Sequence, residues 1–266
     1  MAIEVKDLSF AYAERKVLDN INLKAQPGEL IAVLGPNGAG KSTLFRCILK
    51  FLKNYQGRII MDGRDTADMS SVEIAKSIAY IPQSASPIFN YTVHDTVLMG
   101  TTSGLGLLQM PGEVQDDAVK KALEMLGIEH LAERGINRIS GGERQLVLIA
   151  RAMVQEADII IMDEPTANLD YGNQMRVMEM IRNLADSGYT VMMSTHNPDQ
   201  ALLFADTAFV MKNGRVLASG PVEDVMTDEI MRQLYHVNVK ILEYQYENKR
   251  IRTCVPLGSD KKTEKK

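Results

Sequence analysis

The sequence predicts an α/β fold in which a buried parallel sheet brings polar loops to one edge. Three stretches predict it: an apolar run at 30–34 that leads into the glycine-rich segment 35–43, an apolar run at 159–162 that ends in two acids, and an apolar run at 190–194 that ends in Thr195-His196. Continuous apolar runs of this length are typical of strands buried on both faces. Ligands of such sheets bind at the carboxyl ends of the strands.

Two further regions flank this sheet. Residues 2–34 begin with the alternating apolar positions of antiparallel strands, which predicts an N-terminal antiparallel β subdomain. Between about 86 and 155 the pattern becomes helical, which predicts an α-helical subdomain inserted between core segments at about 1–85 and 156–236.

The C-terminal part is expected to be smaller and simpler. Asn213-Gly214 between apolar segments predicts a hairpin turn, and residues 222–236 have a helical pattern. After a domain at 1–236 we expect a small appendage at 237–256, with weak strand alternation, and a disordered tail at 257–266.

Composition excludes some classes of function. The net charge is −4 and the sole basic block is at the extreme C-terminus, so no nucleic-acid partner is expected. No apolar stretch approaches the ~18 residues that a membrane helix requires. The two cysteines, Cys47 and Cys254, fit no metal-site spacing, and Cys47 is expected to pack in the core.

The segment after the first apolar run fits the phosphate-loop pattern G-x-x-x-x-G-K-[ST]. Its residues are Gly35, Pro36, Asn37, Gly38, Ala39, Gly40, Lys41, Ser42 and Thr43. Glycines allow the backbone N–H groups to approach phosphates, and the following helix N-terminus adds positive potential. Lys41 supplies a charge for the β- and γ-phosphates, and Ser42 a hydroxyl for Mg²⁺. A nucleoside-triphosphate site follows, but kinases, GTPases, motors and transporter ATPases all use this loop.

Five motifs stand in a specific order: the loop at 35–43, Gln83 after a strand, SGGE at 140–143, MDEP at 162–165, and His196 after a strand. Together they resemble the ATPase subunit of ABC transporters over about residues 2–236. The resemblance implies a RecA-like phosphate-loop core, with ATP and Mg²⁺ as ligands. It also implies ATP hydrolysis coupled to transport across a membrane.

The resemblance implies a role for each matching residue in the nucleotide site. Lys41, Gln83, Glu164 and His196 are expected to be catalytic, with Glu164 activating water and His196 near the γ-phosphate. Ser42, Gln83 and Asp163 are expected to hold the metal. Tyr12 is expected to stack on adenine, with Phe10 as the competing candidate.

Other matching residues are expected to act on a second copy of the chain. Ser140, Gly141 and Gly142 match the signature that closes the partner's ATP in a head-to-tail dimer. Asp170 matches the contact between the two chains and is also expected to bind the nucleotide. The signature departs from the usual pattern at Ile139 and Glu143. Glu143 adds a negative charge whose role the sequence leaves open.

Two segments narrow the class of transporter. YTVHDTVLMG at 91–100 and MRQLYHVNVKILEYQ at 231–245 resemble importers of iron chelates (siderophores), haem and cobalamin. Transmembrane permease subunits, and indirectly a substrate-binding protein, are the implied partners, with the chain peripheral on the cytoplasmic face of a prokaryotic cell membrane. The alternatives are a metal or oxyanion importer, a soluble ABC ATPase without transport function, and a phosphate-loop kinase.

Overall fold

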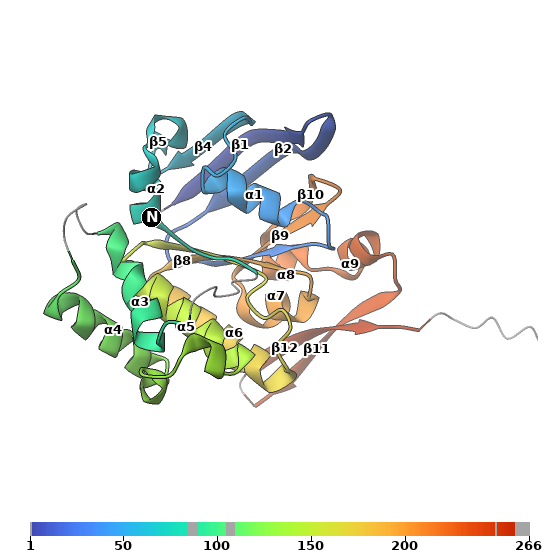
Figure 1. Cartoon of the computed structure of the whole chain (residues 1–266). Helices are drawn as coiled ribbons and strands as arrows, with labels where there is room; N and C mark the ends of the chain where they lie inside the picture. Colours follow the sequence, from blue (N-terminus) through green and yellow to red (C-terminus); the bar gives the residue numbers. More distant parts are fainter. Residues whose placement is uncertain (1, 84–89, 105–109, 248, 259–266) are drawn as a thin grey trace, which may run out of the picture.

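The structure, a computed structural model, describes residues 2–83, 90–104, 110–247 and 249–258 (Figure 1). Within these residues the largest sheet has six strands in the order β10-β9-β3-β8-β7-β6. Its strands are β3 (Leu30–Leu34), β6 (Ile78–Ile81), β7 (Ile159–Asp163), β8 (Thr190–Thr195), β9 (Thr207–Lys212) and β10 (Arg215–Pro221). All neighbouring pairs are parallel except the β9–β10 hairpin, whose turn residues Asn213 and Gly214 both have positive φ.

The three strands predicted from apolar runs lie at the centre of this sheet. Every residue of β3, β7 and β8 is buried, because helices or strands cover both faces. The register pairs Leu34 with Thr195 and Asp163 with Ser194, so the three strands end at the same level. The loops that follow them therefore meet at one edge, as the sequence predicted.

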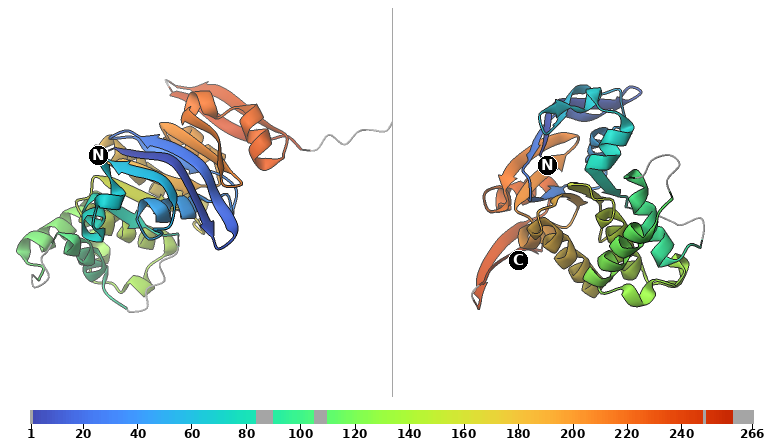
Figure 2. Two further views of the ribbon diagram at one scale, coloured as in Figure 1. Left: turned by 90° about the horizontal axis from the view of Figure 1, so that it is seen from above. Right: turned by 90° about the vertical axis from the view of Figure 1, so that its left-hand side faces the viewer.

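An antiparallel sheet lies against one face of the central sheet (Figure 2). Its order is β2-β1-β4-β5, formed by β1 (Ile3–Tyr12), β2 (Arg15–Ala25), β4 (Gln56–Met61) and β5 (Arg64–Asp65). Helix α1 (Lys41–Ile48) packs between the two sheets, where Phe45 and Cys47 are fully buried. The N-terminal antiparallel subdomain and the core position of Cys47 are thus confirmed.

The other face of the central sheet is covered by helices, most of them from the predicted insertion. They are α3 (Val93–Leu98), α4 (Glu113–Met125), α5 (Gly141–Met153) and α6 (Tyr171–Asp186). Alternate residues of β7 serve the two cores: Ile159 and Ile161 pack toward α1, whereas Ile160 and Met162 pack toward the helices. One sheet therefore separates the phosphate-loop layer from the helical layer.

Short elements complete the fold between these layers. They are α2 (Ser71–Ser77) and the 3₁₀ turns η1 (Thr66–Asp68), η2 (Met99–Ser103), η3 (Glu129–Leu131) and η4 (Ile136–Arg138). No helix of the described ranges is long and apolar enough to cross a membrane.

The C-terminal part contains α7 (Pro198–Phe204), α8 (Val222–Val225), α9 (Asp228–Tyr235) and the hairpin β11 (Val239–Tyr246) with β12 (Lys249–Pro256). The helical pattern predicted at 222–236 is confirmed, and the structure divides this range into two helices, α8 and α9. Thr227 interrupts it as the N-cap of α9, with its Oγ1 accepting a hydrogen bond from the Ile230 N–H at 3.3 Å. Of the tail predicted at 257–266, residues 259–266 lie outside the described residues.

Candidate nucleotide site

The loop after β3 has the backbone of an anion cradle. A side chain at Gly35 would place its Cβ 2.4 Å from the Met211 carbonyl oxygen, so only glycine fits there. Gly38 and Gly40 have φ of +81° and +104°, in the left-handed region that favours glycine. Helix α1 starts immediately afterwards with no acidic residue in its first turn. Its first N–H groups have no partner within the helix and can bind phosphate oxygens.

A cavity of about 520 Å³ surrounds this cradle. Its lining comprises Tyr12, Arg15, Val17, residues 37–43, Gln83 and Glu164. Tyr12 is 42% exposed and faces this cavity, whereas Phe10 is only 8% exposed and supports it edge-on, with ring centroids 4.8 Å apart. The geometry therefore favours Tyr12 over Phe10 as the aromatic residue available to a base.

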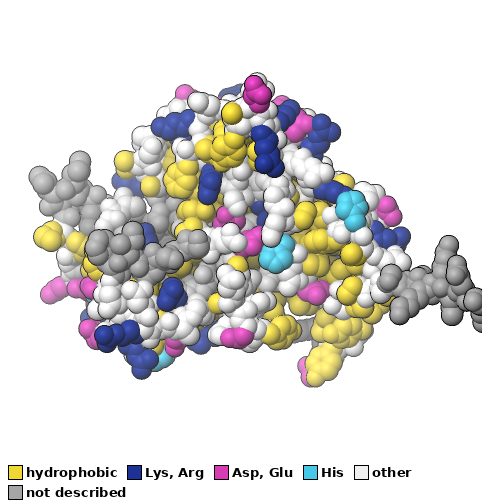
Figure 3. Space-filling model, turned by 45° about the vertical axis from the view of Figure 1, so that its right-hand side comes forward, with side chains coloured by type: hydrophobic (Ala, Val, Ile, Leu, Met, Phe, Trp, Pro, Cys, Tyr) yellow, Lys and Arg dark blue, Asp and Glu magenta, His cyan; other side chains and the backbone are white. Residues whose placement is uncertain are grey.

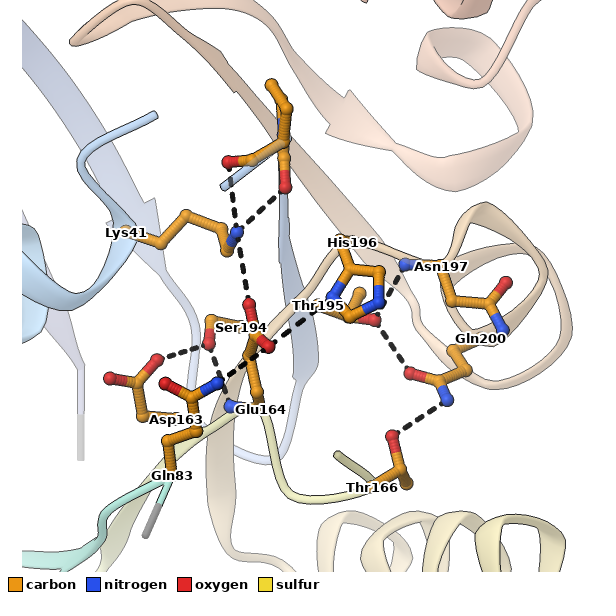
Figure 4. Close-up of polar contacts among 12 residues, drawn as sticks. Lys41, Gln83, Asp163, Glu164, Thr166, Ser194, Thr195, His196, Asn197 and Gln200 are labelled. Carbon is orange, nitrogen blue, oxygen red and sulfur yellow. Dashed lines mark hydrogen bonds and ion pairs between the residues drawn. The ribbon is translucent and has the colours of Figure 1, made fainter. Parts of the chain in front are cut away.

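The Lys41 side chain is buried beside the loop and contacts both neutral and charged acceptors. Its Nζ donates to the carbonyl oxygens of Gly35, at 2.7 Å, and Pro36, at 3.2 Å. It also lies 3.3 Å from Oε1 of Glu164 (Figure 4). Gly35 and Pro36 thus orient the lysine rather than line the cavity.

The Glu164 side chain lies next to the other three residues predicted to be catalytic: Lys41, Gln83 and His196. Its second oxygen, Oε2, accepts a hydrogen bond from Gln83 Nε2 at 3.1 Å and lies 3.4 Å from His196 Nδ1. These residues come from four elements: Lys41 begins α1, and the other three follow β6, β7 and β8. In Figure 3 acidic and histidine side chains lie close together in the middle of the visible face. The sheet topology alone brings them together.

Ser194 holds the two acids, and sequence reasoning missed it. Its hydroxyl donates to Asp163 Oδ1 at 2.6 Å and accepts the Glu164 N–H at 2.9 Å. Glu164 has φ of +48°, which is rare for a residue other than glycine and persists only where its surroundings enforce it. The available signal was a serine directly after the apolar run 191–193 in a strand predicted to be buried.

The residues predicted to hold a metal offer oxygen ligands: the Ser42 hydroxyl, the Asp163 carboxylate and the Gln83 amide. Asp163 is buried, and the described residues contain no cluster of three or more His, Cys, Asp or Glu side chains that could form an all-protein metal cage. Mg²⁺ prefers oxygen ligands and uses one or two carboxylates together with substrate phosphates and water. The donor set therefore fits Mg²⁺ bound with a nucleotide.

His196 is supported from the C-terminal part of the chain. Its backbone carbonyl accepts a hydrogen bond from the Tyr235 hydroxyl at 2.7 Å. Burial raises the pKa of the Tyr235 phenol, so the group remains a donor at neutral pH. Sequence analysis did not predict this contact, because it joins segments 39 residues apart and leaves no local pattern.

The signature residues form the start of α5, with Ser140 as its N-cap. Ser140 Oγ accepts the Glu143 N–H at 3.2 Å, while Glu143 Oε2 accepts the Ser140 N–H at 2.7 Å. This reciprocal capping box holds the pKa of Glu143 below its ordinary value, because hydrogen bonds from Ser140 favour the carboxylate. Within one chain the Glu143 carboxylate is therefore directed at the N-terminus of its own helix.

The start of α6 packs against the start of α5. Asp170 caps α6, and its Oδ1 and Oδ2 accept hydrogen bonds from the Asn173 backbone N–H, at 3.0 Å, and the Asn173 amide, at 2.6 Å. A Cβ at Gly142 would lie 2.5 Å from Asn173 Oδ1, so the two helix starts are in contact. Ser140, Gly141, Gly142 and Asp170 do not line the cavity at the phosphate loop. Within one chain these predicted ATP contacts are not brought to the loop.

Comparison with known proteins identifies the family. Residues 18–167 match the family model for ABC transporters. The chain is 39% identical over 264 residues to an ABC transporter ATP-binding protein of Methanocaldococcus jannaschii, covering 97% of this chain and 99% of that protein. It is 31% identical over 252 residues to the iron(3+)-hydroxamate import ATP-binding protein FhuC of Bacillus subtilis, covering 93% of each.

A solved structure gives the same answer for the fold. A structure described as an inward-facing metal-chelate type ABC transporter aligns with a TM-score of 0.86 and 32% identity, covering 97% of this chain and 98% of that one. The RecA-like core, the antiparallel subdomain and the helical part agree with such cassettes. The chain belongs to the ABC transporter family, as an ATP-binding subunit whose ATP hydrolysis is coupled to transport.

Proposed function

We propose that two copies of this chain enclose two ATP molecules head to tail and drive import of a metal chelate through a partner permease. The observation that supports the dimer is that two parts of the predicted ATP site lie apart within one chain. Lys41, Gln83, Glu164 and His196 converge on one point, whereas the helix start at Ser140 lies outside the cavity at the phosphate loop. A second copy can supply that helix start to the first copy's nucleotide.

Each side chain of the cluster has a task set by its chemistry. Lys41 neutralises phosphate charge, and the Tyr12 ring provides a stacking face for adenine. Ser42, Gln83 and Asp163 hold Mg²⁺, which supplies charge stabilisation at the β- and γ-oxygens when bound. Phosphoryl transfer to water demands positioning and charge stabilisation more than covalent chemistry.

Glu164 and His196 complete the reaction centre. The Glu164 carboxylate, fixed by Ser194 through its backbone, orients the attacking water and accepts its proton. His196 donates a hydrogen bond at the γ-phosphate, where charge develops. Across the dimer, the N–H groups at 140–142 bind the same phosphate, and Asp170 contacts the partner near its site.

The composite site is tested by complementation between two defective chains. The first carries Lys41→Ala and retains an intact signature; the second carries Ser140→Arg and retains an intact phosphate loop. Each chain alone is expected to be inactive. A mixture at equal amounts is expected to recover up to about a quarter of native turnover, because half of the dimers are mixed and each has one intact site. No recovery at any ratio, with native protein that hydrolyses ATP as a monomer, would refute the dimer.

The cargo proposal rests on the relatives. The FhuC relative is an iron(3+)-hydroxamate importer subunit, and the aligned solved structure is of the metal-chelate type. We therefore place this chain on the cytoplasmic face of a prokaryotic membrane as a peripheral subunit, with a permease above it and a substrate-binding protein beyond. Gln83 and the stretch to Val93 are the proposed permease contact, of which residues 84–89 lie outside the described residues.

Co-purification and uptake test this part. A tagged chain isolated from its own cells is expected to retain a many-helix permease. Vesicles containing that complex are expected to accumulate iron-siderophore, haem or cobalamin only with ATP on the cassette side. Uptake of a free metal ion or an oxyanion instead would replace the chelate with the alternative cargo class. Isolation without any membrane protein would refute the transport role.

A further inference from the structure

A chain of buried polar side chains runs beside the nucleotide site, and the backbone carbonyl of its first member, Thr195, accepts the Gly35 N–H at 3.2 Å. Thr195 Oγ1 donates to Gln200 Oε1 at 2.7 Å, and Gln200 Nε2 donates to Thr166 Oγ1 at 2.8 Å (Figure 4). The three residues are 4%, 3% and 7% exposed, in the order Thr195, Gln200, Thr166. We call these residues the Gln200 bridge.

The first end of the bridge fixes the segment that carries His196. Thr195 is the last residue of β8, directly before the histidine. Its hydroxyl oxygen also accepts the Asn197 N–H at 3.0 Å, so it joins both sides of His196. A displacement of Thr195 therefore moves the histidine.

The other end of the bridge fixes the segment that runs from Glu164 to Asp170. Thr166 lies in the turn after Glu164, and its carbonyl accepts the Leu169 N–H at 3.3 Å. Asn168 follows with φ of +63° and lines, together with His196 and Gln200, a cavity of about 340 Å³. The position of this turn sets where Asp170 and the start of α6 lie.

The energetics of the bridge favour a single arrangement. Both polar ends of the Gln200 amide have a hydrogen-bond partner, and each of these two hydrogen bonds stabilises the arrangement. Removing the amide leaves the buried Thr166 hydroxyl without its donor and the Thr195 hydroxyl without its acceptor, although Thr195 still accepts the Asn197 N–H. An apolar residue would satisfy packing on the buried side of α7, but only a side chain with both a donor and an acceptor fulfils both contacts as they stand.

We propose that Gln200 is a positioning residue that couples the His196 segment of one nucleotide site to the Asp170 segment that contacts the other site in the dimer. This inference rests on the proposed dimer. Gln200 acts through Thr195 and Thr166 and does not line the cavity at the phosphate loop. A change at one His196 is thereby transmitted to the partner's nucleotide.

The test uses the mixed dimer with one intact site. In that dimer the Ser140→Arg chain binds the productive ATP, and the Lys41→Ala chain contributes only its signature and its Asp170 segment. Gln200→Leu is placed in the Lys41→Ala chain, whose own nucleotide site is already disabled. A role confined to the residue's own site predicts no change, whereas coupling predicts that turnover at the partner's site falls at least threefold.

Matched variants separate coupling from a general loss of structure. Thr166→Val, in the same Lys41→Ala chain, breaks only the far half of the bridge and is expected to lower turnover similarly. Thr166→Ser keeps the hydroxyl, so the same hydrogen bond can form. The turnover of this variant is expected to lie within about 30% of that of the parent mixture. Thermal melting of each chain shows that the variants remain folded under the assay conditions.

The possible results are distinct. An active parent mixture that is insensitive to both Gln200→Leu and Thr166→Val would overturn the coupling role and leave the dimer intact. A parent mixture with no activity would refute the composite site and the coupling with it. Loss of turnover with Gln200→Leu and Thr166→Val, restored with Thr166→Ser, is the result expected here.

Discussion

Replacing Ser194 with alanine is expected to lower both stability and turnover, because one hydroxyl supports two functional acids. Ser194 is fully buried, and alanine removes a single oxygen without creating a steric conflict. The Glu164 N–H then loses the acceptor at 2.9 Å, and Asp163 loses the donor at 2.6 Å.

The magnitude follows from the two lost contacts. A buried N–H left unsatisfied costs about 1–3 kcal/mol, and a hydrogen bond to a charged group contributes about 1.5–3 kcal/mol. Because Glu164 is 11% exposed, water can replace part of the loss, and we expect a decrease of about 3 kcal/mol in the free energy of unfolding. At about 2–4 °C per kcal/mol for a chain of this size, the melting temperature should fall by about 6–12 °C.

Urea unfolding followed by circular dichroism measures this decrease. The matched control is Ser187→Ala at the exposed end of α6, where the hydroxyl donates to the Asn183 carbonyl at 2.7 Å. An exposed contact of this kind should cost less than about 0.5 kcal/mol. Below the transition the Ser194→Ala protein should also hydrolyse ATP at least about tenfold more slowly, because the positive-φ backbone of Glu164 is no longer held. Equal stability of the two variants would refute this account of the site.

Three further predictions concern other parts of the site. Gly142→Ala should lower the free energy of unfolding in urea by about 1 kcal/mol, because its Cβ would lie 2.5 Å from Asn173 Oδ1. Gly141→Ala should raise the free energy of unfolding, because its Cβ would lie 3.4 Å from its nearest neighbour. A change of the same sign for both variants would contradict this packing. Tyr12→Ala should weaken ATP binding in calorimetry by about 1–3 kcal/mol while Tyr12→Phe should not, and unchanged affinity of the alanine variant would remove the stacking role. Because hydrogen bonds keep the pKa of Glu143 below its ordinary value of 4.5, its stabilising contribution is complete above that pH and is lost as the pH falls through the lower folded-state pKa. The difference in urea midpoint between the native protein and Glu143→Gln should therefore change between about pH 7 and pH 3, and a constant difference would argue against the capping box.

Much of the central fold could be predicted because its signals are local. The apolar runs of β3, β7 and β8 predict strands buried on both faces, and the glycines of the phosphate loop predict its turn. The Ser140–Glu143 capping box was also readable, since serine followed three residues later by glutamate is an N-terminal helix signal. That signal would have predicted the contact between Ser140 and Glu143 from the sequence alone.

Contacts between distant segments could not be predicted in the same way. Ser194 reaches Asp163 only because the register of β7 on β8 pairs those two residues, and no local pattern specifies that register. The Gln200 bridge likewise joins segments that are far apart in sequence. The boundary between α8 and α9 was not predicted either, because the helical apolar pattern continues through Thr227, whose hydroxyl caps the second helix.

The contacts of β12 affect where the chain can be truncated. Asp199 Oδ1 accepts hydrogen bonds from the Cys254 N–H, at 2.7 Å, and the Thr253 hydroxyl, at 3.1 Å, both in β12. Asp199 lies in the first turn of α7, only three residues after His196. Deleting the residues after 236 would remove both hydrogen-bond donors to the Asp199 carboxylate. A truncation that looks harmless would therefore loosen the segment that carries His196.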